Sequence, residues 1–240
     1  MKYIILVSLF VAYSGQTLGN QDVVSKNTNN EVPGQHDINE HQLESINKDY
    51  IRRNEDPVSI QIYYESLCPA SKAYIMYQLF PAWQMFGSRL NIQYKPFGKA
   101  NWTASHHGEV VFNCQHGPAE CFGNTIQACL LELVTDPNEL NPLINCIMSA
   151  EFPPSSAETC LDQVGSLASI DEVYNCVVYR GMELLLDIGN ETLGLEPPLT
   201  AVPWILFNGK YNADDYHESL NDLKSVLCRK YFMDAEQCAI

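Results

Sequence analysis

Apolar and polar residues alternate in two short segments of the chain. Val58, Ile60, Ile62 and Tyr64 occupy every second position, and the pattern returns across residues 90–94. A period of two residues is typical of a strand with one face toward the core. The pattern therefore predicts two strands.

The residues between these strands follow a helical period instead, with apolar positions from Ala73 to Phe86. Pro69 stands near the start of this stretch, where a missing amide proton costs little. Pro81 lies inside it and is expected to kink the helix. The first block is thus predicted as strand, helix, strand.

A second block closes the chain. Residues 204–207 are apolar, and Asn208-Gly209 is a strong signal for a two-residue hairpin turn. Residues 210–212 are expected to return as a short strand, and the apolar residues of 220–227 to form a helix. The order here is strand, turn, strand, helix.

The middle of the chain, residues 114–190, predicts helices. Three stretches carry the helical pattern: Thr125–Val134, Leu140–Met148 and Val173–Ile188. Asp136-Pro137 and Pro153-Pro154 interrupt them. The expected fold class is therefore α/β, with a helical insertion inside a core of one domain, residues 57–240.

The N-terminal residues differ from the rest. Lys2 precedes an apolar run, residues 4–12, that is too short to cross a bilayer of about 30 Å. Residues 1–19 are therefore predicted to be a signal peptide. Residues 20–56 are polar without sustained periodicity and are interpreted as a flexible tail or pro-segment.

The net charge of the chain limits the kinds of partner that it is expected to bind. The chain carries a formal net charge of −15, and nucleic acids and anionic membrane surfaces both require basic patches. Neither a nucleic-acid partner nor membrane insertion is expected. Asn101-Trp102-Thr103 and Asn190-Glu191-Thr192 are glycosylation sequons, which agree with an exported chain.

Nine cysteines are an odd number for an exported protein. Cys68 follows the first predicted strand and precedes the first helix, where redox enzymes place the first cysteine of a CxxC pair. Ser71 stands where the second would be. The other eight are expected to form four disulfides: Cys114, Cys121, Cys129, Cys146, Cys160, Cys176, Cys228 and Cys238. Cys228 with Cys238, and Cys129 with Cys146, are the pairings we predict.

The element order, with a thiol at the first helix, resembles the thioredoxin fold. A more specific resemblance is to the gamma-interferon-inducible lysosomal thiol reductase family, whose signature is matched at every fixed position. These positions are Cys114, Gln115, His116, Gly117, Glu120, Cys121, Asn124 and Cys129. Residues 64–69 and 202–205, together with Asn208-Gly209, extend the similarity.

The resemblance implies a thioredoxin-like core with a thiol site. Pro203 would be a cis proline facing Cys68, and Cys68 would be the nucleophile of an active enzyme. Ser71 replaces the resolving cysteine of the family's reductases. His116, Glu120 and Asn124 belong to the signature, but a structural role is favoured for them, since Glu120 suits the first turn of a helix.

Three interpretations of Cys68 are open. In the first, Cys68 acts as a monothiol, and an external thiol resolves the mixed disulfide. In the second, Cys68 has no remaining redox role, and the protein works by binding. In the third, Cys68 forms a structural disulfide with another cysteine. Two groups of residues have the side-chain types of metal ligands. Zinc on the signature cysteines and His116 matches no standard spacing, and His106, His107 and Glu109 are typical of solvated residues. No metal and no cofactor are expected.

The sequence thus predicts a secreted glycoprotein, with a lysosomal location as the alternative. We expect it to bind an extracellular or cell-surface protein without full two-cysteine reductase activity. The alternative is a thiol-disulfide oxidoreductase that works as a monothiol through Cys68 on a disulfide-containing protein substrate.

Overall fold

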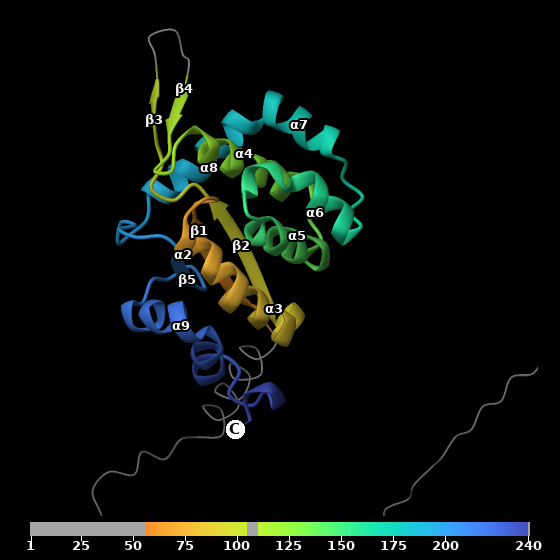
Figure 1. Cartoon of the computed structure of the whole chain (residues 1–240). Helices are drawn as coiled ribbons and strands as arrows, with labels where there is room; N and C mark the ends of the chain where they lie inside the picture. Colours follow the sequence, from red (N-terminus) through yellow and green to blue (C-terminus); the bar gives the residue numbers. More distant parts are fainter. Residues whose placement is uncertain (1–55, 105–109, 240) are drawn as a thin grey trace, which may run out of the picture. The chain divides into compact units, whose positions relative to one another are not determined.

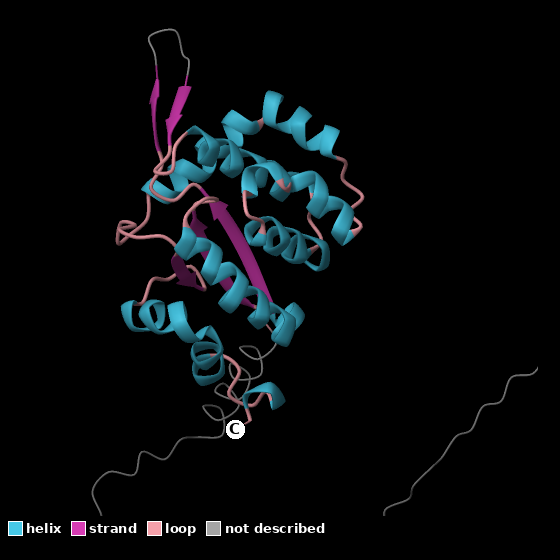
Figure 2. Ribbon diagram, viewed as in Figure 1, coloured by secondary structure: helices cyan, strands magenta, loops and turns pink. Residues whose placement is uncertain are grey.

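The computed structural model describes residues 56–104 and 110–239, and the arrangement of their elements is drawn in Figures 1 and 2. The predicted signal peptide, nearly all of the predicted tail, and His106, His107 and Glu109 lie outside the described residues. In the part described, no helix is long and apolar enough to cross a membrane.

A three-stranded sheet in the order β2-β1-β5 forms the centre of the core. Strands β1 (Val58–Tyr64) and β2 (Leu90–Pro96) are parallel, and β5 (Trp204–Phe207) runs antiparallel to β1. Ile60 and Ile62 of β1 are fully buried. The alternating pattern therefore predicted both parallel strands correctly.

The connection from β1 to β2 is one helical stretch in which the hydrogen bonding changes from α-helical to π-helical and back. It consists of α2 (Pro69–Tyr74), the π-helix η1 (Ile75–Leu79) and α3 (Phe80–Phe86), followed by the 3-10 turn η2 (Gly87–Arg89). The Phe80 N–H donates to the Ile75 carbonyl, five residues back. Pro81 has no N–H to continue the α-helical ladder, so the expected irregularity lies at the turn before it.

Helices from three parts of the chain pack on this sheet. Apolar residues of α2, η1, α3 and α9 (Ala213–Lys230), together with Ile144 and Met148 of α5 (Pro137–Ser149), join the strands in one buried cluster. A short 3-10 turn, η4 (Glu236–Cys238), ends the described chain. Figure 1 shows α2 and α3 lying across the sheet and α9 next to them.

The insertion is mainly helical, as predicted, and has a buried cluster of its own centred on Ile126, Leu130 and Leu143. Its helices, besides α5, are α4 (Pro118–Leu133), α6 (Ala157–Val164), α7 (Ile170–Tyr179) and α8 (Gly181–Leu193), with the 3-10 turn η3 (Pro153–Ser155). Asp136 caps α5 by accepting from the Asn138 N–H. Ser169 and Glu172 form a capping box that starts α7.

Two sequence predictions of elements were wrong. The single helix Val173–Ile188 is two helices, α7 and α8, because Arg180 leaves the helical conformation between them, with φ −125° and ψ −19°. The return strand 210–212 is a single bridge between Phe207 and Lys210. Asn212 instead caps α9 by accepting from the Asp215 N–H, which ends the strand.

A two-stranded sheet was missed. Strand β3 (Asn101–Ala104) pairs antiparallel with β4 (Val110–Asn113). Trp102 and Phe112 pack edge-on against the buried Phe97. Helix α8 comes close here, since a Cβ on Gly189 would meet the Phe97 ring at 2.7 Å.

Candidate functional site

Cys68 caps the N-terminus of α2, directly after the loop that follows β1. Its backbone is extended, with φ −67° and ψ 122°, and its carbonyl accepts from the Lys72 N–H at 3.0 Å. The thiol is free, and the residue is 9% exposed. The structure therefore places an unpaired thiol at the start of the first helix, just beneath the surface.

Ser71 lies one helical turn after Cys68 and is fully buried. Its Oγ accepts a long hydrogen bond of 3.5 Å from the Glu65 N–H. Lys72, the next residue, donates from Nζ to the Ala150 carbonyl at 2.7 Å and so ties α2 to the insertion.

Pro203 precedes β5, and the Val202–Pro203 peptide bond is cis, as expected. Its carbonyl accepts from the Tyr216 hydroxyl at 3.3 Å. Trp204 stacks flat on Tyr211, with ring centroids 4.3 Å apart, and is buried. The contact between Pro203 and Cys68 stays a prediction.

The signature residues of α4 bond to the loop that precedes Cys68. Asn124 accepts from the Ser66 N–H at 2.9 Å, and the Ser66 hydroxyl donates to the Glu120 carbonyl at 3.1 Å. All three residues are fully buried. Gly123 is required here, because a Cβ would lie 2.6 Å from the Ser66 Oγ. Asn124 therefore holds the Cys68 loop against α4, in line with the favoured structural role.

Glu65 is a further charged residue of this site that the sequence did not single out. It is fully buried; its Oε1 accepts from the Lys99 N–H at 2.8 Å, and its Oε2 lies 3.4 Å from the His116 Nδ1. Burial raises the pKa of its carboxyl, and the Lys99 N–H offsets part of that rise. A glutamate directly after a buried strand was the one sequence signal that could have pointed to this residue. Its partners could not be predicted, because they come from distant segments of the chain.

Glu120 lies in the first turn of α4, as expected, and its carboxylate also contacts His116. Its Oε1 accepts from the His116 N–H at 3.0 Å, and its Oε2 contacts the His116 Nδ1 at 2.5 Å. Glu65, His116 and Glu120 therefore form a cluster of three titratable side chains, which we call the acidic-histidine cluster.

The eight other cysteines form four disulfides, as predicted, and among the nine Cys68 alone is free. The pairs are Cys114–Cys121, Cys129–Cys176, Cys146–Cys160 and Cys228–Cys238. The predicted Cys129–Cys146 pairing was wrong, because Cys129 on α4 faces α7 while Cys146 on α5 faces α6. A zinc site on Cys114, His116, Cys121 and Cys129 is excluded, since the three cysteines are in disulfides and disulfide sulfurs are not thiolate ligands.

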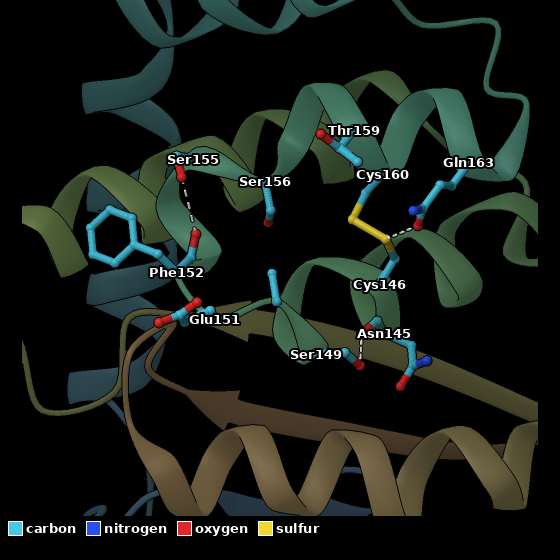
Figure 3. Close-up of a pocket in the computed structure, with 11 residues that line it drawn as sticks. Asn145, Cys146, Ser149, Glu151, Phe152, Ser155, Ser156, Thr159, Cys160 and Gln163 are labelled. Atoms are coloured by element: carbon cyan, nitrogen blue, oxygen red, sulfur yellow. Dashed lines mark hydrogen bonds between the residues drawn. A yellow bond between two sulfur atoms is a disulfide. The ribbon is translucent and has the colours of Figure 1, made fainter.

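Both sequon asparagines are exposed, Asn101 in β3 and Asn190 in α8, and their glycosylation stays a prediction. A cavity of about 730 Å³ opens between α5, η3 and α6 (Figure 3). The Cys146–Cys160 disulfide lines one side, with Glu151 and the exposed Phe152 at the other end. Cys68 is not among its lining residues.

A parallel βαβ unit with a thiol at its first helix and an antiparallel third strand preceded by a cis proline define a class: proteins with the thioredoxin-like fold. Among solved structures, the chain is similar to a DsbA from Chlamydia trachomatis, with a TM-score of 0.50 and 10% identity, over 75% of this chain and 90% of that one. This likeness supports the fold alone.

The chain belongs to the gamma-interferon-inducible lysosomal thiol reductase family. The family model of that description matches residues 59–164. The chain is 35% identical to the reductase of that name from Carassius auratus, over 74% of this chain and 70% of the relative. It is 32% identical to GILT-like protein 1 of Drosophila melanogaster, covering 72% and 74%, and 31% identical to the Mus musculus reductase, covering 73% and 68%.

Proposed function

We propose that this protein acts by binding a protein partner through the surface around Cys68, and that it does not complete a two-cysteine reductase cycle. The observation that carries the proposal is Ser71. The position one turn after Cys68 holds a hydroxyl that is fully buried and bonded to the Glu65 N–H.

The chemistry of the cycle explains why Ser71 matters. A thiolate attacks a substrate disulfide, forms a mixed disulfide and releases one substrate thiolate. A second protein thiolate then attacks the mixed disulfide, releases the other substrate thiolate and leaves the protein oxidised. A serine hydroxyl is hardly ionised at neutral pH and forms no stable bond to sulfur. With Ser71, a mixed disulfide on Cys68 would therefore persist.

One observation favours a second candidate, a monothiol oxidoreductase. Cys68 is free and stands at the N-cap of α2, the position of the attacking cysteine in CxxC enzymes. An external thiolate would attack the mixed disulfide, regenerate the Cys68 thiolate and leave the substrate joined to the external thiol.

Secretion is part of the proposal, with delivery to lysosomes as the alternative. The short apolar run near the N-terminus and the four disulfides support an oxidising compartment. The net charge of −15 supports a protein partner rather than nucleic acid.

The test compares disulfide turnover with trapping. Wild type, Cys68→Ala, Ser71→Cys and Ser88→Cys are incubated with a fluorescent peptide disulfide, with and without glutathione. Ser88→Cys is the control for an added thiol, because Ser88 is exposed and lies in η2, at the other end of the crossover helix. Released thiol is followed over time, and mixed disulfides are identified by mass spectrometry.

We expect wild type to form at most one mixed disulfide per chain, on Cys68, with little turnover. Ser71→Cys should turn over at least about tenfold faster, because its sulfur would stand one turn from Cys68. Ser88→Cys should behave as wild type. Equal turnover by wild type and Ser71→Cys with glutathione would refute the binding proposal and establish the monothiol reaction.

A further inference from the structure

Three ligand-type atoms of the acidic-histidine cluster converge on one point beside the Cys68 loop. The His116 Nδ1 lies 2.5 Å from the Glu120 Oε2 and 3.4 Å from the Glu65 Oε2. One potential ligand atom from each residue lies within 4.8 Å of the other two. Two ligands held about 2.0–2.2 Å from one ion at a tetrahedral angle lie roughly 3.3–3.6 Å apart. The Glu65 Oε2 already lies at such a distance from the His116 Nδ1, and the Glu120 Oε2 would have to move about 1 Å away from it as the ion replaced their hydrogen bond.

Each carboxylate is oriented by the backbone. The Glu65 Oε1 accepts from the Lys99 N–H, and the Glu120 Oε1 accepts from the His116 N–H. In both cases the second oxygen is left to face His116. Hydrogen bonds that fix one oxygen and aim the other are the usual outer-shell support of metal-binding carboxylates.

The Glu65 Oε2 is the independent sign of a ligand. It is a buried oxygen that makes no hydrogen bond among the described residues, although the His116 Nδ1 lies 3.4 Å away, and Glu65 as a whole is fully buried. An unpartnered buried carboxylate oxygen is costly and rare in native proteins. A cation bound between this oxygen and His116 would remove that cost.

The charges of the cluster fit a divalent ion. Two fully buried carboxyl groups meet one imidazole here, so a bound ion would have two carboxylates and one ring nitrogen beside it. A divalent cation balances both carboxylates while the imidazole stays neutral and offers its Nδ1 lone pair.

The three residues are held in place by the surrounding chain, and His116 is accessible to solvent. The Cys114–Cys121 disulfide closes a loop of sequence separation seven that contains both His116 and Glu120. Glu65 is held in place from the other side by the turn at Gly98, where a Cβ would meet its Cγ at 2.4 Å. The His116 side chain is 34% exposed, which leaves a path for the ion and for a water ligand.

We propose that Glu65, His116 and Glu120 bind one divalent transition-metal ion, of the zinc class, through two carboxylate oxygens and the His116 Nδ1. The mixed nitrogen and oxygen ligands favour zinc, cobalt or manganese over calcium. The ion links the loop before Cys68 to the start of α4. The site therefore joins the thioredoxin-like core to the insertion, whatever the fate of the Cys68 thiol.

The test uses Zn²⁺ and Co²⁺ on the full chain after treatment with a chelator. Zinc binding is measured by calorimetry and thermal unfolding, and cobalt by its visible absorption. Glu65→Gln, Glu120→Gln and His116→Gln each remove one ligand with little change of shape. His217→Gln is the matched control, because His217 is an exposed histidine on α9 outside the cluster. Cys68→Ala tests for thiolate ligation.

We expect one tight Zn²⁺ per wild-type chain. Zinc at about 100-fold over its Kd should raise the melting temperature by roughly 5–10 °C, since it binds only the folded state. Each cluster variant should weaken binding at least about 100-fold, beyond the effect of losing an outer-shell partner. His217→Gln and Cys68→Ala should bind as wild type, and cobalt should show no thiolate charge-transfer band.

Several outcomes would overturn the proposal: no tight zinc binding by wild type, binding unchanged in the cluster variants, or binding abolished by Cys68→Ala. If Glu65→Gln fails to fold, His116→Gln still decides the matter, because its partly exposed side chain can be replaced without burying a void. Matching far-UV spectra of wild type and variant confirm that comparison.

Discussion

Replacing Gly98 by alanine tests whether Glu65 is held as the structure shows. Gly98 has φ +61°, a left-handed conformation, and a Cβ added there would lie 2.4 Å from the Glu65 Cγ and 2.8 Å from its Oε1. Glu65 cannot easily move away, because it is fully buried and bonded to the Lys99 N–H. Gly98→Ala therefore combines backbone strain with a steric clash.

The size of the effect follows from these two costs. The left-handed conformation costs a residue with a Cβ roughly 1–2 kcal/mol, and overpacking a buried site costs about 1–3 kcal/mol. Gly98→Ala should therefore lower the free energy of unfolding by about 2–5 kcal/mol. Gly165→Ala is the matched control: its φ is +68°, with no atom within 4 Å of an added Cβ. It should lose only the backbone share, about 1–2 kcal/mol.

The assay is urea unfolding with disulfides intact, followed by tryptophan fluorescence and far-UV circular dichroism, whose coincidence checks two-state behaviour. Adding Glu65→Ala should remove the clash, so the double variant should be less destabilised than the sum of the single changes by at least about 1 kcal/mol. A Gly98→Ala variant no less stable than Gly165→Ala, or additive losses in the double variant, would refute the placement of Glu65.

Two further predictions concern the insertion and the last helix. Cys129 and Cys176 are separated by 47 residues, and Cys146 and Cys160 by 14. The entropy of loop closure therefore predicts that replacing both cysteines of a pair by alanine lowers the free energy of unfolding by about 4 kcal/mol for the first pair and about 3 kcal/mol for the second. Urea midpoints in the opposite order would contradict this pairing scheme. Asp222 caps the second half of the kinked α9, and the Ser225 hydroxyl, then its N–H, lower the pKa of the Asp222 carboxyl below its ordinary 3.8. The charged carboxylate therefore stabilises the fold at pH values above the ordinary pKa, and this stabilisation is lost as the pH falls through the lowered pKa. In urea unfolding, the difference in free energy of unfolding between wild type and Asp222→Asn should be full at neutral pH and vanish in strong acid. A difference that does not change with pH would contradict this role of Asp222.

Much of the core could be predicted from local patterns. Val58, Ile60 and Ile62 alternate with the partly buried Ser59 and Gln61 because one face of this part of β1 packs into the core. The position of Cys68 between a strand and a helix, and its status as the odd cysteine of nine, also follow from order and counting. These features depend on residues close in sequence or on a census of the chain, and both are visible without a structure.

Tertiary packing decided the rest. Asp136-Pro137 indicated a turn between α4 and α5 correctly, yet Cys129 pairs with Cys176, because the face of α4 that bears it is covered by α7. The acidic-histidine cluster joins the loop after β1 to the start of α4, more than fifty residues along the chain. The sequence by itself determined the strand-helix-strand order of the first block and the missing second thiol at Ser71. Only the folded chain decided which buried groups meet, because burial and contact between distant segments depend on how whole helices pack and not on local spacing.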